Sequence, residues 1–338
     1  SNLAEENMPI KKKPACNRCI TFFKRALILT SLFYVGFGPL SATAFEILLG
    51  TGETGTFSHF SGRLLSRIIN RHADGITCKA LPAPDGVHNL TNLKEGSLDI
   101  ILTDSLMLHD AIKKKGAFEF LDISYDTLRI FFPVYETPFT LVVRQDAKIR
   151  SLDDLAGKRI NAGAPQSPRH FATDTIMRAK NWTPDRFSLI AELPTSLSQD
   201  TMAFCHGTVQ AMVYLGVHPD SALQQLSKLC GANLVSMDDG DIARLVAGHA
   251  AFSKITIPAK TYPTQVDAVT TFGPRVILVG SEDLDVETAA KLMHTINLQR
   301  KYLQSAHPAL ASFTVKAVLA GEFGIPLHPG AVKYFSEQ

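Results

Sequence analysis

From residue 45 onward, short apolar runs alternate with segments whose apolar residues recur at helical spacing, and this alternation constrains the fold most. Residues 45–49 form an apolar run, and in residues 57–71 Phe57, Phe60 and Leu64 fall on one helical face. The further expected strands are 76–81, 98–102, 128–134, 139–143, 159–162, 187–190, 209–213 and 276–279. The further expected helices are 87–94, 105–114, 169–179, 197–204, 218–229, 286–303 and 308–319. Strands joined by crossover helices predict an α/β fold of mostly parallel sheets flanked by helices, in two units.

The composition excludes several classes of protein. The chain has 338 residues, 45% of them hydrophobic, and a formal net charge of +2, so most of it is long and apolar enough to fold around a core. Only one long apolar run is present, which argues against a multispan membrane protein.

The N-terminal 44 residues resemble a secretory signal peptide. A basic stretch between Lys11 and Arg25 precedes an apolar run over residues 26–37, and Ala42-Thr43-Ala44 follows. The run is shorter than the ~20 residues that cross a bilayer as a helix, which argues against an anchor. We therefore predict cleavage after Ala44 and a periplasmic protein. The remaining chain has 28 basic and 30 acidic residues, a balance that indicates no nucleic-acid partner.

The cysteines fit an exported protein. Cys16 and Cys19 leave with the leader, and Cys78, Cys205 and Cys230 remain. Because an oxidising compartment allows pairing, we predict a disulfide between Cys205 and Cys230, at the ends of two expected helices, and a buried thiol at Cys78.

A glycine-rich loop at residues 50–55 (GTGETG) follows the first strand and matches a dinucleotide-binding pattern. Such a site also needs an acid at the end of the second strand, which here reads Lys79-Ala80-Leu81. We therefore expect no nucleotide cofactor. The glycines allow a tight turn, and the preferred interpretation is a cradle of backbone N–H groups at a helix N-terminus that holds a small anion.

Six segments in order carry a resemblance to one family. They are residues 50–56 (GTGETGT), 84–90 (PDGVHNL), 96–99 (GSLD), 155–159 (LAGKR), 163–167 (GAPQS) and 326–331 (PLHPGA). Together they resemble the TAXI family, the solute receptors of tripartite ATP-independent periplasmic (TRAP) transporters. Two features depart from that family: Phe57-Ser58-His59 stands where tyrosines are usual, and Gln166-Ser167-Pro168 replaces Gly-Ser-Gly.

The resemblance implies a two-lobed, type II-like periplasmic-binding-protein fold that closes on one small organic anion or amino acid, such as glutamate or a related dicarboxylate. The first lobe is expected over 45–134 plus 268–338 and the second over 135–267. TRAP permease subunits are the implied partners, and we expect a monomer without cofactor or metal.

The resemblance also implies a set of ligand-binding residues. In the first lobe and at the hinge these are Gly55, Thr56, Phe57, Asn89, Thr103, Asp104, Tyr135 and Glu136, and in the second lobe Ser167, Arg169, His170, Tyr214 and Gly216. Each has a structural alternative: Thr56, Asn89 and Asp104 as caps of helices or turns, Tyr135 as hinge packing, and Arg169 as a solvated helix residue.

Signals for catalysis are weak. The eleven histidines show no metal-binding spacing such as H-E-x-x-H, and no G-x-S-x-G elbow is present. We therefore predict a binding protein rather than an enzyme. The alternatives are a secreted enzyme on the same fold, such as a transferase or lyase, and a surface scaffold or adhesin without a ligand.

Overall fold

The computed structural model describes residues 44–194, 197–315 and 323–338. The predicted signal peptide, apart from Ala44, lies outside the described residues. The strands are β1 (Phe45–Thr51), β2 (Ile76–Pro82), β3 (Ile100–Asp104), β4 (Leu128–Glu136), β5 (Phe139–Arg144), β6 (Arg159–Asn161), β7 (Leu189–Ala191), β8 (Ala211–Leu215), β9 (Ala232–Val235), β10 (Phe252–Ile257) and β11 (Val269–Ser281). The α-helices are α1 (Phe57–His72), α2 (Gly86–Lys94), α3 (Ser105–Lys113), α4 (Pro168–Ala179), α5 (Leu197–Cys205), α6 (Ser221–Cys230), α7 (Gly240–Gly248), α8 (Val286–Leu298), α9 (Arg300–Ala306) and α10 (Pro329–Ser336).

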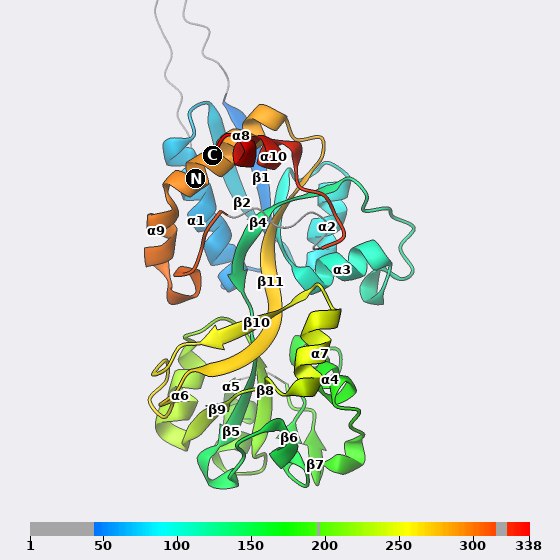
Figure 1. Ribbon diagram of the computed structural model, residues 1–338, viewed down its shortest axis with the longest axis vertical. Coiled ribbons are helices and arrows are strands. Elements are labelled where there is room, and N and C mark those ends of the chain that lie inside the picture. Colours follow the sequence, from blue (N-terminus) through cyan, green and yellow to red (C-terminus); the bar gives the residue numbers. More distant parts are fainter. Residues whose placement is uncertain (1–43, 195–196, 316–322) are drawn as a thin grey trace, which may run out of the picture. The chain divides into compact units, whose positions relative to one another are not determined.

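The strands form two groups that share β11. The first sheet has the order β2-β1-β3-β11-β4, and the second has β5 at its centre, with β8, β6 and β7 following in that order. In the second sheet β9 also pairs with β5, and β10 pairs with β11. The long β11 runs from the second sheet into the first (Figure 1).

The α/β class is confirmed, but the sheets are mixed rather than mostly parallel. The β1–β2, β1–β3, β6–β7 and β6–β8 pairs are parallel, whereas β11 and β5 pair antiparallel to all their neighbours in the described residues. The physical reason is the connectivity. The chain leaves the first sheet through β4 and β5 and returns through β11, so these strands run against their neighbours instead of following crossover helices.

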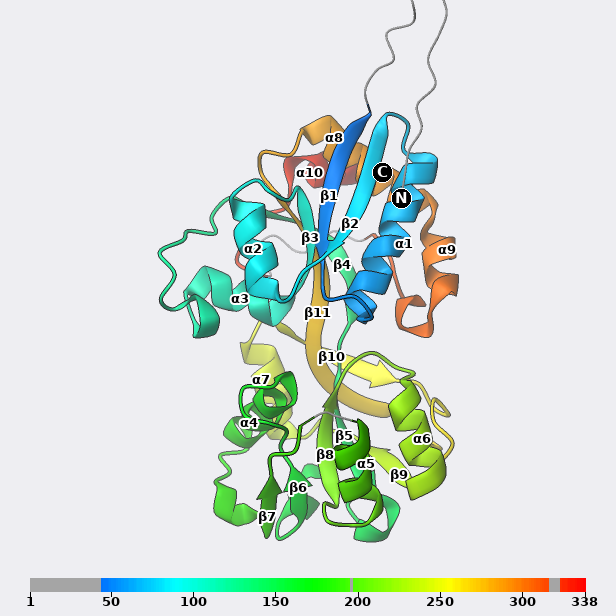
Figure 2. The same cartoon turned by 180° about the vertical axis from the view of Figure 1, so that it is seen from behind.

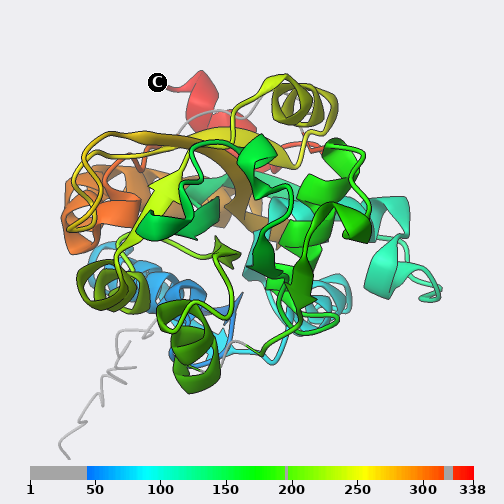
Figure 3. The same ribbon diagram turned by 90° about the horizontal axis from the view of Figure 1, so that it is seen from below.

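Helices cover both faces of each sheet (Figures 1 and 2). On the first sheet, successive strand residues alternate between two cores: Leu102 packs with α1 and α8, and Ile101 packs with α2 and α3. On the second sheet, one core includes residues of α4 and α7, and the other includes residues of α5 and α6. The view from below shows helices on either side of the second sheet (Figure 3). This arrangement leaves the loops at the strand ends free to form a site.

The two crossing segments touch at Gly273. A Cβ atom there would lie 2.3 Å from the Thr137 carbonyl oxygen and 2.9 Å from Pro138 Cα, which only glycine avoids. The close approach is fixed by a hydrogen bond from Thr137 N to the Pro274 carbonyl oxygen, 2.9 Å long. The segment in which the chain leaves the first sheet, near residues 133–138, therefore contacts the segment in which it returns, near 269–274. The lobe boundaries stay a prediction, since β11 belongs to both sheets.

Most expected elements are present, with shifted ends. The sequence reasoning missed β9, β10, α7 and α10, and it predicted one helix over 286–303 where the structure has α8 and α9. The helix expected over 308–319 is wrong in its described part, where only a 3₁₀ turn, Pro308–Leu310, forms. Residues 316–319 lie outside the described residues. Pro308 does occupy the first position of that turn, where its missing N–H costs nothing.

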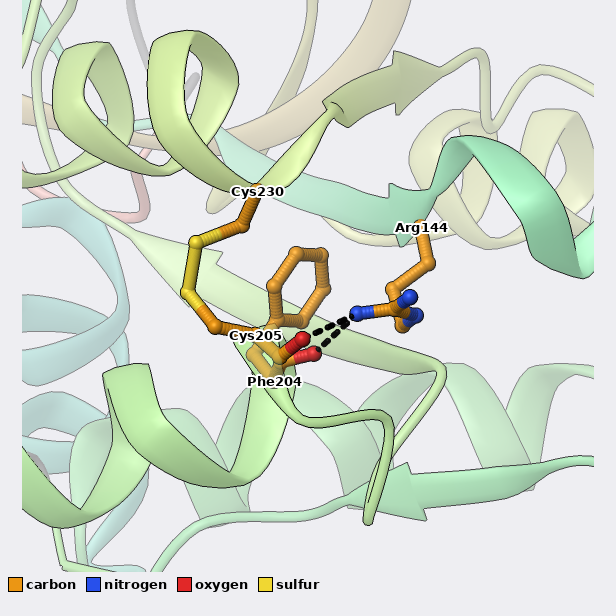
Figure 4. Close-up of a disulfide and its surroundings, with 4 residues drawn as sticks. All are labelled: Arg144, Phe204, Cys205 and Cys230. Atoms are coloured by element: carbon orange, nitrogen blue, oxygen red, sulfur yellow. Dashed lines mark hydrogen bonds between the residues drawn. A yellow bond between two sulfur atoms is a disulfide. The ribbon is translucent and has the colours of Figure 1, made fainter.

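The structure has the Cys205–Cys230 disulfide that the sequence predicts (Figure 4). It joins the last residues of α5 and α6. The Arg144 guanidinium donates hydrogen bonds of 2.7 and 2.8 Å to the carbonyl oxygens of Phe204 and Cys205, which satisfies the C-terminal end of α5. Cys78 is a buried free thiol, and burial raises its pKa to about 12.

Candidate functional site

A cleft with a volume of about 430 Å³ lies where the loops of the two sheets meet. Part of its wall is formed by residues at or just after the carboxyl ends of β1, β2, β3 and β8, each of which has a parallel neighbour. Ligands of α/β folds bind at this end of the strands. The lining residues are Gly52, Ser58, Asp85, Gly86, Asn89, Leu102, Thr103, Asp104, Leu106, Met107, Asp110, Thr137, Phe139, Gln166, Ser167, Pro168, Phe171, Leu215, Pro274 and Val276. This is the candidate site.

Four of the residues singled out from the sequence line this cleft: Asn89, Thr103, Asp104 and Ser167. Asn89 lies in the first turns of α2, Thr103 and Asp104 end β3, and Ser167 caps α4 by accepting a 3.2 Å hydrogen bond from His170 N. The elements that hold them are far apart in sequence, and the crossing strands bring them together.

Asn89 and Thr103 are buried and incompletely bonded. Asn89 donates from Nδ2 to the Thr51 carbonyl oxygen at 2.9 Å, but its Oδ1 has no hydrogen-bond partner in the part of the chain that the structure describes. Thr103 Oγ1 likewise has none there, although the side chain is only 4% exposed. Gly50 allows this placement, because a Cβ on it would lie 2.6 Å from Asn89 Oδ1. Buried polar atoms without partners are rare, so these two point to a ligand.

Three carboxylates line the cleft. Asp104 caps α3 by accepting a 2.8 Å hydrogen bond from Met107 N, and Asp85 caps α2 by accepting one of 2.7 Å from His88 N. Asp110 lies on α3, two turns from Asp104. Burial raises the pKa of Asp104, the backbone N–H groups of Met107 and Leu106 oppose that rise, and the charge of Asp110 adds to it. Asp104 is thus a helix cap, as the alternative interpretation of the sequence predicts.

Two backbone N–H groups of the glycine-rich loop are bonded within the loop and the start of α1. Gly52 N donates to Ser58 Oγ at 3.0 Å, and Thr56 N donates to the Glu53 carbonyl oxygen at 3.1 Å. The Thr56 hydroxyl caps α1 through His59 N. Gly55 and Thr56 are exposed outside the cleft lining, which takes only Gly52 and Ser58 from this region. These two N–H groups are thus already bonded, and the anion cradle stays a prediction.

Phe57, Tyr135 and Glu136 lie beside the cleft rather than in its lining. Phe57 packs edge-on against Tyr135, with ring centroids 4.8 Å apart, and both belong to the core of the first sheet. Burial raises the pKa of the Tyr135 phenol. Burial also raises the pKa of Glu136, while the charge of Arg275, its cross-strand partner, lowers it. These residues support the crossing.

Arg169 is held by a buried ion pair. Its Nη1 donates to Asp200 Oδ2 at 2.7 Å, and the two side chains are 6% and 10% exposed. Asp200 Oδ1 accepts from Asn161 Nδ2, also at 2.7 Å, and Asn161 Oδ1 accepts from the backbone N–H groups of Gly163 and Leu193. The guanidinium is therefore not solvated, and Arg169 is not among the lining residues; its contact with a ligand stays a prediction.

The remaining predicted residues lie behind the lining. His170 contacts the Gly163 carbonyl oxygen through Nδ1 at 3.2 Å and Asp174 through Nε2 at 3.6 Å. Tyr214 ends over Gly216, where an added Cβ would lie 2.4 Å from the phenolic oxygen. Burial and the nearby Asp220 raise the Tyr214 pKa. Leu215, between them, is the residue of this strand end that lines the cleft.

Sequence reasoning missed several lining residues that carried a signal. Asp85 and Gly86 belong to the PDGVHNL segment and Gln166 belongs to GAPQS, two of the segments that carry the family resemblance. Met107 and Asp110 follow Asp104 at intervals of three, which places all three on one helical side. Phe139 and Pro274 carried no signal, because they reach the cleft only through the strand crossing.

Neither a metal site nor a membrane span is found in the ranges that the structure describes. No group of three or more His, Cys, Asp or Glu side chains there is arranged to hold a metal ion. None of the described helices combines the length and apolarity that crossing a bilayer requires.

Solved structures that resemble this chain include solute-binding proteins. A TctC solute-binding protein from Polaromonas is 11% identical with a TM-score of 0.52, over 74% of this chain and 82% of that one. The periplasmic aliphatic sulphonate-binding protein SsuA from Escherichia coli is 15% identical with a TM-score of 0.45, over 87% and 79%. The likeness to the TctC protein shows that this chain shares the α/β fold of a solute-binding protein. The model of the NMT1-like family matches residues 49–338, so the chain belongs to the NMT1-like family.

Proposed function

We propose that this protein is a periplasmic solute-binding protein, which captures a small molecule in the cleft and passes it to a membrane transporter. The observation that carries the proposal is the cleft itself, because its lining combines Asn89 and Asp104 from the first sheet's loops with Ser167 and Phe171 from the second. A solute held there would contact both sides. Such a contact can shift an equilibrium between open and closed forms, since only differential binding does so.

The transporter, on this proposal, is of the TRAP type, and the protein is a TAXI-type receptor exported by its leader. The ordered motifs of the sequence support this assignment, and the disulfide at Cys205 and Cys230 fits an oxidising compartment. The lobes would be 45–134 plus 268–338 and 135–267, hinged where Gly273 meets Thr137. The resemblance suggests glutamate, a dicarboxylate or another amino acid as the solute, and the acidic lining favours solutes that carry an amine.

Native mass spectrometry of the protein purified from its host tests this function, together with a thermal-shift screen of metabolites. We expect a retained or added small molecule that raises the melting temperature and is recovered unchanged. Small-angle scattering should show a smaller radius of gyration in its presence. Consumption of the compound would favour the secreted enzyme instead, and a screen without any binding would contradict the proposal.

A closed form populated at about 1% without solute needs roughly 5.5 kcal/mol of differential affinity to reach about 99%. A few charge-assisted hydrogen bonds from the second set of loops are enough to supply it.

A further inference from the structure

The chemical character of the cleft goes beyond the function proposed above and rests on it. We infer that the cleft binds an organic amine, a solute that presents a protonated amino group to Asp104 and carries no net negative charge. The solute is thereby distinguished from the small organic anions that the sequence resemblance implies. The inference stands on the charge of the lining and on two buried atoms that lack hydrogen-bond partners.

The first argument is the charge of the wall. Among the described residues that line the cleft, Asp85, Asp104 and Asp110 are acidic and none is basic. A helix N-terminus carries about half a positive charge, which favours anions. At α2 and α3 that half charge already faces the carboxyl group of the capping residue, Asp85 or Asp104. Asp110 adds a third carboxylate, so the sum at this wall is negative and opposes a dicarboxylate.

Two arginines adjoin the described lining residues, and both already have contacts. The Arg169 guanidinium is paired with Asp200. Arg275 adjoins the lining residues Pro274 and Val276, and its guanidinium lies over the Phe323 ring at 4.7 Å. To gain either arginine as a partner, a carboxylate solute would have to break an existing contact, whereas an amine meets three carboxylates in the lining itself.

The second argument is the pair of buried polar atoms. Asn89 Oδ1 accepts hydrogen bonds only, and Thr103 Oγ1 can accept them. Both residues are at least nine-tenths buried, both line the cleft, and neither atom has a partner in the described residues. An ammonium group has three N–H donors and no acceptor. Asp104 follows Thr103 at the end of β3 and also lines the cleft, so the lining carries three groups that can accept hydrogen bonds from an ammonium group.

The rest of the wall indicates an organic solute rather than a metal ion. Apolar side chains from both sheets line the cleft, namely Leu102, Leu106, Met107, Phe139, Phe171 and Leu215. Such walls suit the hydrocarbon part of an amine, and a volume of about 430 Å³ is in the range of small-molecule sites. In the ranges described, the three carboxylates do not form a metal-binding group.

Titration calorimetry on the full-length mature protein tests the inference, with L-lysine and 1,4-diaminobutane as amine probes and L-glutamate and succinate as acid probes. We expect at least one amine probe to bind at least tenfold more tightly than either acid. Asp104→Asn should weaken amine binding roughly 10- to 100-fold, the range for a lost hydrogen bond between charged groups. Asn caps a helix as well as Asp does, so this variant should keep its melting temperature.

Asp285→Asn is the matched control. It makes the same change at the N-cap of α8, where Asp285 accepts a 2.9 Å hydrogen bond from Thr288 N outside the cleft lining, and it should leave amine affinity unchanged. Thr103→Val is a second, nearly isosteric variant that should weaken amine binding without lowering the melting temperature.

The possible results separate the two proposals. Tighter binding of succinate or L-glutamate than of the amines, or amine binding that Asp104→Asn leaves intact, overturns the inference and leaves solute binding standing. If no probe binds and no solute copurifies, the solute-binding function fails as well.

Discussion

Replacing Arg169 by methionine should destabilise the fold rather than act first on ligand affinity. The guanidinium and the Asp200 carboxylate are 6% and 10% exposed, and their hydrogen bond is 2.7 Å long. Removing the arginine leaves a buried carboxylate that still accepts a hydrogen bond from the Asn161 amide. Breaking a buried pair from one side typically costs about 3–5 kcal/mol, because the remaining charge is not compensated.

That cost converts into a measurable melting shift. A chain of this size loses about 1.5 °C per kcal/mol, so Arg169→Met should lower the melting temperature by roughly 4–8 °C. Arg178→Met is the matched control on the same helix. Arg178 is 79% exposed and lies 3.8 Å from Asp174, so its removal should change stability by less than about 1 kcal/mol.

Chemical denaturation of both variants, with calorimetric binding in parallel, is the assay. The double variant Arg169→Met/Asp200→Leu should recover part of the loss, since neither charge remains buried. An Arg169→Met protein with wild-type stability and a weakened solute affinity would refute this reasoning and return Arg169 to the ligand-binding set.

Three further predictions follow from other parts of the chain. Replacing Cys205 and Cys230 by serine should lower the free energy of unfolding by about 3 kcal/mol in guanidinium denaturation, because the crosslink spans 25 residues; no change would contradict this. Gly273→Ala should destabilise by about 1–3 kcal/mol, because its Cβ would strike the Thr137 carbonyl oxygen; a melting curve like that of wild type would argue against the crossing. Burial lowers the pKa of His218 to about 4 from an unfolded value near 6.5, so its contribution to stability is present above about pH 6.5 and is lost as the pH falls towards 4. Between pH 7 and pH 5 the wild type should therefore lose about 2 kcal/mol more than His218→Gln, and equal losses would exclude the effect.

The sequence predicts the local elements of the first sheet well, because their signals are local. The apolar face of α1 and the Thr56 cap place that helix within one residue of its observed end. β9 was missed for the opposite reason. It is a four-residue strand, ANLV, too short to show a period, and its conformation depends on pairing with β5. α7 did carry a local signal that was overlooked, because Ile242, Leu245 and Val246 recur at helical spacing and pack on one core.

The helix expected over 308–319 is a case in which contacts with distant residues outweigh a local signal. Pro308 suits a helix start, and the apolar residues beyond it are compatible with a helix. In the structure the chain instead makes one 3₁₀ turn, and Leu310 and Phe313 are buried in the core of the first sheet. Burial of these two side chains against Phe132 and its neighbours outweighs the local propensity.

The location of the cleft was predictable in outline, but its electrostatics were not. Parallel strands place their carboxyl ends together, so Asn89, Thr103 and Asp104 were expected at one edge. Whether Arg169 adds a positive charge there depends on its ion pair with Asp200, which lies 31 residues away in the sequence. No local sequence pattern predicts this pair. An arginine at the start of a helix can bind an anion when its guanidinium is free. When a buried carboxylate pairs with it, as Asp200 does here, the guanidinium belongs to the protein interior. Once Arg169 is counted with Asp200, the charges left in the lining are those of aspartates, and the same cleft changes from a site for acids to a site for amines.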